Sequence, residues 1–438
     1  MKIVVIGTGY VGLVSGACFS EFGFDVTCVD KDAQKIAALR EGVIPIYEPG
    51  LDDLVKRNAE AGRLHFETDL SSHVPEADVI FIAVGTPTRR GDGHADLTFV
   101  FAAAEEIAKS LSGYSVIVTK STVPVGTGRQ VHDIIAKTNP QADFDVASNP
   151  EFLREGSAIG DFMRPDRVVV GAESDRAIEM MRQLYRPLYL IETPLLFAKL
   201  ETAELIKYAA NAFLAVKISY INQIADLCEK VGANVHEVAK GMGLDKRIGA
   251  KFLHPGPGYG GSCFPKDTLA LVKTAELFET EIPMVAGVVA YNDDRKLAMA
   301  KRIMAAMGGD VKGKKIAILG LAFKPETDDM RESPALAILP QLCAEGAEIV
   351  AYDPAAMAEA KPLLPAAIRY ADTAQEAITG ADAAVVITEW NEFRALSAAT
   401  FTSHMAGDVL IDLRNLYDGV AMQEGGLTYH SIGRPLPA

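Results

Sequence analysis

Short apolar runs alternate with amphipathic stretches through the first half of the chain. Runs suited to buried strands cover residues 2–6 ("KIVVI"), 79–84 ("VIFIAV"), 115–119 ("SVIVT") and 167–171, and stretches of helical periodicity separate them. Buried strands that alternate with helices are typical of a parallel sheet covered on both faces. The pattern therefore predicts an α/β domain with a doubly wound sheet.

The pattern changes near Lys199. From there to about Val231 the sequence keeps helical periodicity for some thirty residues without a proline. At 1.5 Å per residue, one helix of this length would span about 50 Å, which is longer than a small domain. We expect one long helix with a broad apolar face that a second subunit covers, and a kinked pair of helices is the alternative.

A second sheet pattern begins near Lys314. Strands are predicted for "KKIAILG", "EIVAYDP", "ADAAVVIT" and "DVLIDL", and "SPALAILPQLCAEG" has a helical pattern despite Pro340. The two ends of the chain thus resemble each other, although "GLAFKP" stands where a glycine-rich turn would be needed. We predict an α/β protein with two Rossmann-like doubly wound sheets joined by a long central helix. The expected domain bounds are 1–198, 199–300 and 301–438.

The first strand is followed by the glycine pattern GxGxxG at Gly7, Gly9 and Gly12. In a dinucleotide site these glycines permit the tight turn, the approach of the pyrophosphate and the close packing of helix on strand. Asp30 ends the next strand, 18 residues after Gly12, where a carboxylate accepts the ribose hydroxyls and repels a 2′-phosphate. The motif predicts NAD rather than NADP, although Lys31 and Lys35 weaken the preference.

Composition limits the partners, metal sites and cell compartments that fit the sequence. The 438 residues include 58 Asp and Glu against 43 Lys and Arg, and a net charge of −15 argues against a nucleic-acid partner. The five scattered cysteines form no CxxC pair, so we expect no metal site and a reducing compartment. Glycines interrupt the apolar start, which argues against a signal peptide, and no apolar run reaches the length of a membrane helix. We expect a cytoplasmic protein without a membrane partner.

One cysteine has unusual neighbours, in "GYGGSCFPKD". Glycines at 256, 258, 260 and 261 would let the backbone approach a ligand closely, and Pro265 suits the first turn of a helix. Cys263 would then lie at a helix N-terminus beside Lys266, and both features stabilise a thiolate. A buried, inert cysteine is the alternative. In an NAD enzyme, a nucleophilic thiol indicates an aldehyde that is oxidised to a thioester and hydrolysed to an acid.

The sequence also resembles a known family, the nucleotide-sugar dehydrogenases of the UDP-glucose 6-dehydrogenase type, in their bacterial form. The resemblance covers essentially the whole chain. It rests on seven motifs in the same order: "GTGYVG", "VGTPT", "STVPVGT", "NPEFLREG", "ELIKYAANAF", "GYGGSCFPKD" and "GLAFKPETDDMRESP". It implies two NAD-dependent oxidations of C6 of UDP-glucose, which give UDP-glucuronate for polysaccharide synthesis. It also makes 1–198 the NAD-binding domain, 199–300 the dimerisation region and 301–438 the UDP-sugar-binding domain.

The resemblance assigns catalytic roles residue by residue. Cys263 matches the nucleophile, and Lys207 and Asn211, four residues apart on one helix face, match stabilisers of an oxyanion. Asp267 matches a residue that assists proton transfer through water. Glu151 and Thr122 match residues that position and activate the hydrolytic water, and burial is expected to raise the pKa of such a carboxylate. Without the motifs, each of these side chains could be an ordinary helix-face or turn residue.

The resemblance also implies contacts to the two ligands. Beside the glycines and Asp30, the expected cofactor contacts are Tyr10, Val11, Lys35, Thr86, Thr122, Glu155, Lys266 and Arg331. The expected substrate contacts are Glu151, Phe152, Leu153, Arg154, Glu155, Lys207, Asn211, Phe252, Leu253, His254, Pro255, Gly256, Gly260 and Lys324. Arg247 matches a residue that reaches the substrate site of a neighbouring subunit, which predicts a homodimer or larger assembly. His254, Pro255 and Pro257 vary within the family and leave the shape of the sugar pocket open.

Three other functions stay in competition. A dehydrogenase for GDP-mannose or UDP-N-acetylmannosamine would share most motifs, but Ser262 and Phe264 favour the glucose type. A β-hydroxyacid dehydrogenase would share the first sheet and a Lys–Asn pair, but it needs neither the thiol nor the second sheet. An NAD-responsive binding protein would not need Cys263, Lys207, Glu151 and Asp267 together.

Overall fold

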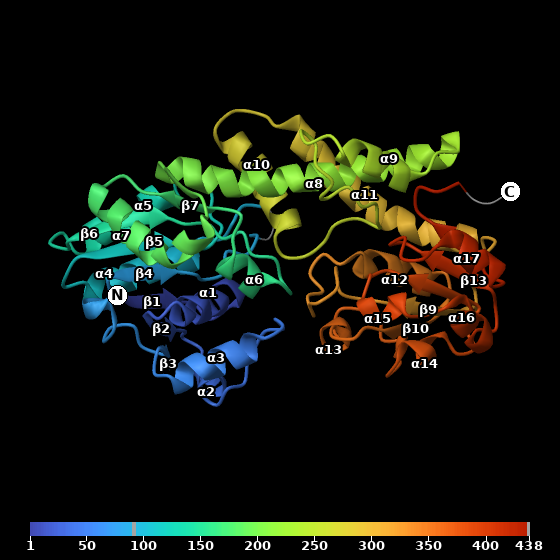
Figure 1. Cartoon of the computed structure of the whole chain (residues 1–438), viewed down its shortest axis with the longest axis horizontal. Coiled ribbons are helices and arrows are strands. Elements are labelled where there is room, and N and C mark those ends of the chain that lie inside the picture. Colours follow the sequence, from blue (N-terminus) through green and yellow to red (C-terminus); the bar gives the residue numbers. More distant parts are fainter. Residues whose placement is uncertain (90–92, 436–438) are drawn as a thin grey trace. The chain divides into compact units, whose positions relative to one another are not determined.

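The computed structural model describes residues 1–89 and 93–435, which form two compact units. The first unit contains Met1–Ala210 and Ala270–Thr280, and the second contains Asn211–Leu269 and Glu281 onward. Each unit is built on one sheet, coloured blue to green in the first and orange to red in the second (Figure 1). The fold is α/β with two parallel-sheet domains, as the apolar runs predict.

The first sheet has the strand order β3-β2-β1-β4-β5-β6-β7-β8. Its strands are β1 (Lys2–Ile6), β2 (Asp25–Val29), β3 (Leu64–Glu67), β4 (Val79–Ile82), β5 (Ser115–Thr119), β6 (Phe144–Ser148), β7 (Val168–Gly171) and β8 (Leu195–Ala198). Neighbouring strands are parallel except β6 and β7, which pair antiparallel at Ser148 and Gly171. The parallel prediction therefore fails at this one pair.

Helices cover both faces of this sheet. They are α1 (Tyr10–Glu21), α2 (Ala33–Arg40), α3 (Leu51–Glu60), α4 (Thr98–Ser110), α5 (Thr127–Thr138), α6 (Ala158–Met163) and α7 (Asp175–Leu184), with short 3₁₀ turns η1 (Val74–Glu76) and η2 (Arg186–Ile191). Ile3 and Val5 of β1 belong to the core that includes α1, whereas Val4 and Ile6 belong to the core that includes α4. Successive residues of a strand point to opposite faces, so an unbroken apolar strand needs helices on both sides.

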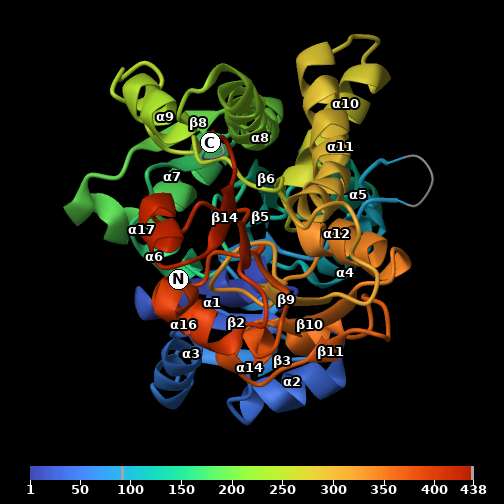
Figure 2. The same cartoon turned by 90° about the vertical axis from the view of Figure 1, so that its right-hand side faces the viewer.

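The stretch after Lys199 forms one helix, α8 (Leu200–Val231). Figure 1 shows it along its length as a continuous helix, and Figure 2 shows it nearly end-on. The prediction of one long helix is confirmed over the kinked alternative. No helix within residues 1–89 and 93–435 combines the length and the apolar character that spanning a membrane would require.

The second sheet is fully parallel, in the order β11-β10-β9-β12-β13-β14. Its strands are β9 (Lys315–Leu319), β10 (Glu348–Tyr352), β11 (Arg369–Tyr370), β12 (Ala383–Val386), β13 (Val409–Asp412) and β14 (Thr428–Ser431). The remaining helices are α9 (Val235–Gly243), α10 (Phe264–Leu277), α11 (Pro283–Ala306), α12 (Pro334–Ala344), α13 (Met357–Ala360), α14 (Ala374–Ile378), α15 (Asn391–Arg394), α16 (Ala398–His404) and α17 (Gly419–Glu424). Pro340 lies inside α12, as predicted.

The second sheet uses its strand-end acid for its own structure. Asp353 follows β10, as Asp30 follows β2, and its carboxylate is fully buried. Its Oδ2 accepts from the backbone N–H of Leu321 at 2.7 Å and from Trp390 Nε1 at 3.1 Å, and its Oδ1 accepts from the N–H of Ala356 at 2.8 Å. The N–H groups of Ala322 and Ala355 also donate to it, at 3.0 and 2.9 Å, so five donors occupy its lone pairs and none is left for a ribose. The second sheet therefore keeps the fold without a dinucleotide site.

This network predicts the effect of removing the acid. Changing Asp353 to Ala leaves several buried donors without an acceptor, each of which costs about 1–3 kcal/mol. We expect the second unit to lose about 3 kcal/mol or more of its free energy of unfolding. Trp390 is the only tryptophan and donates directly to Asp353, so its fluorescence during urea unfolding reports the transition.

The matched control is Asp353→Asn, which keeps one acceptor oxygen and should be milder. An Asp353→Ala midpoint equal to that of the unmodified chain would contradict the structural role.

Candidate active site

The glycine turn after β1 fits a dinucleotide. Gly7 has φ +98°, and a Cβ there would lie 2.7 Å from the carbonyl oxygen of Ala83; a Cβ at Gly12 would lie 1.9 Å from that of Gly7. Gly9 behaves differently, because a Cβ there would meet nothing within 4 Å. The first turn of α1 carries no acidic residue, and no side chain caps it. Its free N–H groups therefore face open space where a pyrophosphate fits.

Asp30 is held in place at the end of β2. Its Oδ2 accepts from Thr8 N at 2.9 Å, from Thr8 Oγ1 at 2.7 Å and from Lys35 Nζ at 3.2 Å. Partial burial alone would raise its pKa, but the bonds from Thr8 and Asp32 and the charge of Lys35 lower the pKa to about 2. Asp30 is thus an anion at neutral pH, as the NAD prediction requires. The predicted contact Lys35 pairs with this carboxylate.

Tyr10 links the glycine turn to the loop before α6. Its hydroxyl bonds the carboxylate of Glu48, and Glu48 accepts from the N–H of Gly156 at 2.7 Å and from that of Ala158 at 2.7 Å. Burial and the adjacent Glu48 raise the pKa of Tyr10. Sequence reasoning singled out Tyr10 but missed Glu48, whose only local sign is an acidic residue in a proline- and glycine-rich turn. The neighbouring residues Val11 and Glu155 are partly buried.

Two predicted residues meet where β4 and β5 end. The hydroxyl of Thr86 donates to the carbonyl oxygen of Thr122 at 2.9 Å. The loop of Thr122 is fixed further along by Glu204 of α8, which accepts from the N–H groups of Gly126 and Gly128, each at 2.7 Å. Burial raises the pKa of Glu204 to about 7. Thr122 therefore sits on a loop that α8 holds directly.

A buried ion pair joins Glu151 to Lys207. Glu151 Oε1 lies 2.9 Å from Lys207 Nζ, and the two side chains are 5% and 3% exposed. Glu151 Oε2 accepts from the N–H of Leu153 at 2.5 Å, and Lys207 Nζ lies 5.4 Å from the ring centre of Phe152. Burial would raise the pKa of Glu151, but the charge and hydrogen bond of Lys207 lower it. The expectation of a raised pKa at Glu151 is therefore wrong.

Lys120 is a second buried cation that sequence reasoning missed. It follows β5 directly and is 4% exposed, with Nζ 2.9 Å from Asn149 Oδ1 and 3.3 Å from the hydroxyl of Tyr185. Burial lowers its pKa to about 8, and the charge of Lys207 adds to this while that of Glu151 opposes it. A lysine directly after the strand "SVIVT", all of whose residues are buried, is the sequence sign that could have revealed it.

The cysteine loop belongs to the second unit. Cys263 directly precedes α10, and its carbonyl oxygen accepts from the N–H of Asp267 at 2.8 Å. Asp267 is 1% exposed; its Oδ2 accepts from Asn211 Nδ2 at 2.7 Å and its Oδ1 from Lys266 Nζ at 2.8 Å. The hydroxyl of Ser262 lies 3.4 Å from Cys263 Sγ. Three predicted catalytic residues are thereby brought together around the start of one helix.

The other cysteines lie in surroundings that disfavour a thiolate. Cys18, Cys28 and Cys228 are buried, and Cys343 is partly buried. Burial raises the pKa of all four thiols, to about 12 at Cys28. Among the cysteines, only Cys263 lies directly before a helix with a lysine close by in the first turn. This contrast supports Cys263 as the reactive thiol.

The glycines near Cys263 lie close to other segments of their own unit. A Cβ at Gly260 would lie 2.4 Å from the carbonyl oxygen of Glu332, and one at Gly261, where φ is +85°, would lie 2.6 Å from the ring of Phe323. At Gly258 a Cβ would lie 2.9 Å from Lys296 Cγ. These contacts are one reason for glycine at the three positions, and the approach of a ligand to this backbone stays a prediction.

Several predicted ligand contacts have partners within their own segments. Arg154 pairs with Asp161 at 2.6 Å, Arg247 with Asp245 at 2.6 Å and Arg331 with Asp329 at 2.8 Å, and each arginine is mostly exposed. Lys324 lies over the ring of Phe323 at 5.4 Å. In the remaining segment Leu253, Pro255 and Gly256 are buried, Phe252 is partly buried and His254 is exposed.

The environment of Lys120 predicts a pH dependence. Its folded pKa of about 8 lies below the ordinary 10.5, so between these values the unfolded chain binds the proton that the folded chain has lost. Stability must therefore rise with pH across this window, by about 3 kcal/mol in total. We expect the Lys120→Met variant to lack this rise.

The measurement is urea unfolding of both proteins at pH 8, 9 and 10. The difference in free energy of unfolding between them should grow with pH in favour of the unmodified chain. A difference that stays constant would contradict the lowered pKa.

Known proteins are similar to this chain along nearly its whole length. Three domains of one family match: the NAD binding domain at residues 1–189, the central domain at 201–294 and the UDP binding domain at 317–419 of the UDP-glucose/GDP-mannose dehydrogenase family. A UDP-glucose 6-dehydrogenase of Rhizobium meliloti (strain 1021) is 60% identical over 99% of this chain and 100% of its own. The UDP-glucose 6-dehydrogenase TuaD of Bacillus subtilis (strain 168) is 49% identical over 99% of this chain and 93% of its own.

A solved structure agrees in fold. The UDP-glucose dehydrogenase of the archaeon Pyrobaculum islandicum superposes with a TM-score of 0.90 at 37% identity, over 98% of this chain and 96% of its own. The glycine turn with Asp30 thus lies in an NAD-binding domain of known type, and NAD is the cofactor. With an NAD-binding domain, a central domain and a UDP-binding domain in order along its length, this chain belongs to the UDP-glucose/GDP-mannose dehydrogenase family.

Proposed function

We propose that the chain is a UDP-glucose 6-dehydrogenase, which oxidises C6 of UDP-glucose twice and releases UDP-glucuronate. The observation that carries the proposal is Cys263 at the start of α10, with Asp267 and Asn211 bonded beside it, in a chain that has an NAD-binding domain. One oxidation of an alcohol needs no thiol, whereas the passage from aldehyde to acid does. Full-length similarity to enzymes of that name supports the choice of sugar.

NAD supplies the acceptor for the two electrons removed from C6 in each oxidation. Gly7, Gly9 and Gly12 would hold its pyrophosphate at α1, and Asp30 would bind its adenosine ribose. Tyr10, Val11, Lys35, Thr86, Thr122, Glu155, Lys266 and Arg331 remain proposed cofactor contacts. Because Asp30 is ionised, it would repel the 2′-phosphate of NADP, so NAD should be strongly preferred.

In the first oxidation the chain must take a proton from the C6 hydroxyl and stabilise the negative oxygen. Lys207 and Asn211 are four residues apart on α8, so an ammonium and an amide project from the same side of one helix. Both are proposed to donate to the oxygen at C6. Asp267, already bonded to Asn211, would pass the proton through water.

In the second oxidation Cys263 would add to the aldehyde carbon. A carbon–sulfur bond forms and the carbonyl oxygen takes a proton; loss of that proton together with a hydride from the same carbon, which NAD would accept, then leaves a thioester. Water then attacks the thioester carbon, the carbon–sulfur bond breaks, and the thiolate is regenerated. Glu151 and Thr122 are proposed to position this water. The lowered pKa of Glu151 keeps it an anion, which can orient the water by accepting its hydrogen bond.

The proposed contacts of the sugar nucleotide come from several segments of the chain. Lys324 would contact its phosphates, and the backbone from Phe252 to Gly256 with Gly260 would surround the sugar. The segment Phe152–Glu155 would complete the contacts, and Arg247 would reach the site of a neighbouring subunit. The guanidinium of Arg247 is 90% exposed and bonds Asp245, two residues earlier, so it lies at the surface as such a reach requires. The domain bounds 1–198, 199–300 and 301–438 and a cytoplasmic location stay part of this proposal.

The proposal predicts how many NADH form for each UDP-glucose and which step fails without the Cys263 thiol. The unmodified chain should form two NADH for each UDP-glucose consumed and release no aldehyde. Changing Cys263 to Ala should leave binding of NAD and UDP-glucose nearly intact, while formation of acid falls by several orders of magnitude. Ser should not restore it, because little alkoxide forms near neutral pH.

The measurement follows NADH by absorbance in single turnovers, starting from UDP-glucose and separately from its 6-aldehyde. GDP-mannose and UDP-N-acetylmannosamine serve as competing substrates. Cys343→Ala is the matched control and should behave as the unmodified chain. A ratio near one NADH per sugar, or acid formation by Cys263→Ala at the normal rate, would contradict the mechanism.

We also propose that two copies of the chain pair through α8. This helix exposes a row of large apolar side chains along its length: Leu205, Phe213, Tyr220, Leu227 and Val231. Phe213, Tyr220 and Leu227 recur at intervals of seven, which places them along one stripe of the helix. A stripe of this length on a water-soluble enzyme favours a partner helix.

Changing both Tyr220 and Leu227 to Glu should therefore yield monomers, because four buried like charges would repel across a symmetric interface. Sedimentation velocity at micromolar concentration measures the change, and Leu363→Glu, an equally exposed site outside α8, is the control. A fully active monomer of the unmodified chain would contradict the pairing and the proposed role of Arg247.

A further inference from the structure

Three buried polar side chains of α11 lie on one face of that helix. Asn292, Arg295 and Lys296 are 2%, 4% and 6% exposed, and their spacing of three and four residues puts them side by side. None of them is among the residues proposed to act at C6. What they contact is the backbone that leads to Cys263.

Asn292 satisfies both backbone groups of Tyr259. Its Oδ1 accepts from Tyr259 N at 2.8 Å, and its Nδ2 donates to the carbonyl oxygen of Tyr259 at 3.1 Å. A carboxamide bonded in this way acts as a neighbouring strand would, because it fixes the peptide plane on both sides. Tyr259 lies four residues before Cys263.

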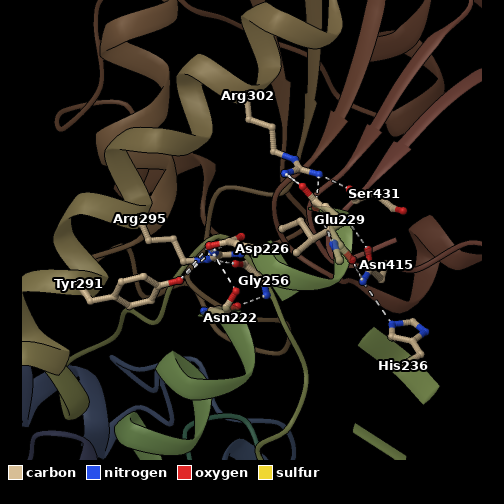
Figure 3. Close-up of polar contacts among 12 residues, drawn as sticks. Asn222, Asp226, Glu229, His236, Gly256, Tyr291, Arg295, Arg302, Asn415 and Ser431 are labelled. Atoms are coloured by element: carbon tan, nitrogen blue, oxygen red, sulfur yellow. Dashed lines mark hydrogen bonds and ion pairs between the residues drawn. The ribbon is translucent and has the colours of Figure 1, made fainter. Parts of the chain in front are cut away.

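Arg295 and Asn222 together bond both backbone groups of Gly256. Its Nε donates to the carbonyl oxygen of Gly256 at 2.7 Å, while the N–H of Gly256 donates to Asn222 Oδ1 of α8 at 2.8 Å. The guanidinium is itself held by Asp226, with Nη1 at 2.9 and 3.0 Å from the two carboxylate oxygens, and by the hydroxyl of Tyr291 at 3.0 Å. Figure 3 shows Arg295 extending from α11 toward Asp226, Asn222 and Gly256.

The backbone from Gly256 to Cys263 has few conformational restraints of its own. Gly258 and Gly261 both have positive φ, at +123° and +85°, and glycine gains more conformational freedom than other residues when it is released. Lys296 packs its stem against Gly258 and pairs with Glu332 at 2.9 Å. A glycine-rich segment therefore keeps one conformation because α11 fixes its backbone at Gly256 and Tyr259.

We propose that Asn292 and Arg295 are positioning residues that hold the Gly256–Cys263 loop so that the Cys263 thiol meets the substrate carbon. The inference rests on the proposed function, since the thiol must attack one defined atom. A buried arginine is costly to keep and is often replaceable by an apolar side chain without loss of stability. Its hydrogen bond to Gly256 therefore indicates a demand on loop geometry rather than on stability alone.

The same helix offers a matched control two turns further on. Arg302 also pairs with an acidic residue of α8, Glu229, at 2.7 and 3.0 Å, and also donates to a backbone carbonyl oxygen. That carbonyl belongs to Ser431 in β14 and not to the cysteine loop. Figure 3 shows the two arginines reaching α8 side by side along α11. Loss of Arg302 should thus cost stability without moving Cys263.

The experiment compares Arg295→Met, Asn292→Leu, Asn292→Asp and Arg302→Met with the unmodified chain. Two quantities are measured: kcat with UDP-glucose and NAD, and the rate at which iodoacetamide alkylates Cys263, quantified by peptide mapping. A misplacement of about 1 Å at a reacting atom costs on the order of a hundredfold in rate. We expect kcat to fall ten- to a hundredfold in Arg295→Met and Asn292→Leu while the dissociation constant for NAD stays within twofold.

Alkylation of Cys263 should become at least fivefold faster in the same two variants, because a released loop opens access to the thiol. Asn292→Asp keeps the acceptor for Tyr259 N and should recover part of kcat. Arg302→Met should match the unmodified chain in both quantities. Alkylation needs no substrate, so it tests the loop even if the chain does not oxidise UDP-glucose, in which case the proposed function fails separately.

Three results would overturn the proposal. The first is that Cys263 is alkylated in Arg295→Met and Asn292→Leu at a rate within twofold of the unmodified chain. The second is that Arg302→Met changes kcat and alkylation as much as these two variants do. The third is that alkylation becomes faster while kcat stays unchanged in a chain that oxidises UDP-glucose. If Arg295→Met does not fold, as judged by the fluorescence of Trp390, the two Asn292 variants decide the outcome.

Discussion

The buried ion pair between Lys207 and Glu151 is the interaction on which the first unit's part of the site depends. Moving two charges to 5% exposure or less is costly, and only close contact offsets the cost. The pair therefore has one acceptable arrangement, in which the loop after β6 lies against α8. Loss of either partner would leave a lone buried charge, which costs about 3–5 kcal/mol. The same contact keeps Glu151 ionised, so the constraint that shapes the loop also sets the charge available to chemistry.

This constraint extends along α8. Lys207 makes its ion pair to Glu151, and Asn211, four residues later, makes its hydrogen bond to Asp267. Both side chains keep this spacing only while the helix is unbroken between them, and α8 has no proline or glycine from Leu200 to Val231. Glu204, one turn earlier, holds the loop of Thr122 through two backbone N–H groups. Three positions of one helix thereby bond the loop of Thr122, Glu151 and Asp267.

Local pattern was enough to predict the features that depend on neighbours in sequence. The glycine turn, the single helix α8 and Cys263 at the start of α10 all follow from residue spacing. Contacts between distant segments did not follow. Glu151 was expected to have a raised pKa because its partner, 56 residues away, is invisible to local reasoning. Gly260 and Gly261 lie against Glu332 and Phe323, which are more than sixty residues ahead in the sequence, so no local pattern could indicate these contacts. The resemblance to a family supplied the roles of residues, but it did not supply their mutual bonds.

The two sheets show how one turn geometry can have two uses. In both, a glycine with φ above +90° follows the first strand and donates its N–H to the residue before an aspartate, at 2.8 Å for Gly7 and for Gly320. In both, the next N–H bonds that aspartate, at 2.9 Å for Asp30 and 2.7 Å for Asp353. The sheets diverge after this point. Helix α1 begins at Tyr10, close behind its glycine, whereas α12 begins only at Pro334.

The longer connection in the second sheet changes what the aspartate does. Together with Trp390 it leaves Asp353 fully buried, and it carries the mostly exposed Arg331. Asp30 keeps 20% of its side chain exposed and stays accessible to a ribose. A short connection thus leaves a helix N-terminus and an acid open to a dinucleotide, while a long one buries the acid and frees the loop for other ligands. The fold is shared, and the length of one loop decides the function of each sheet.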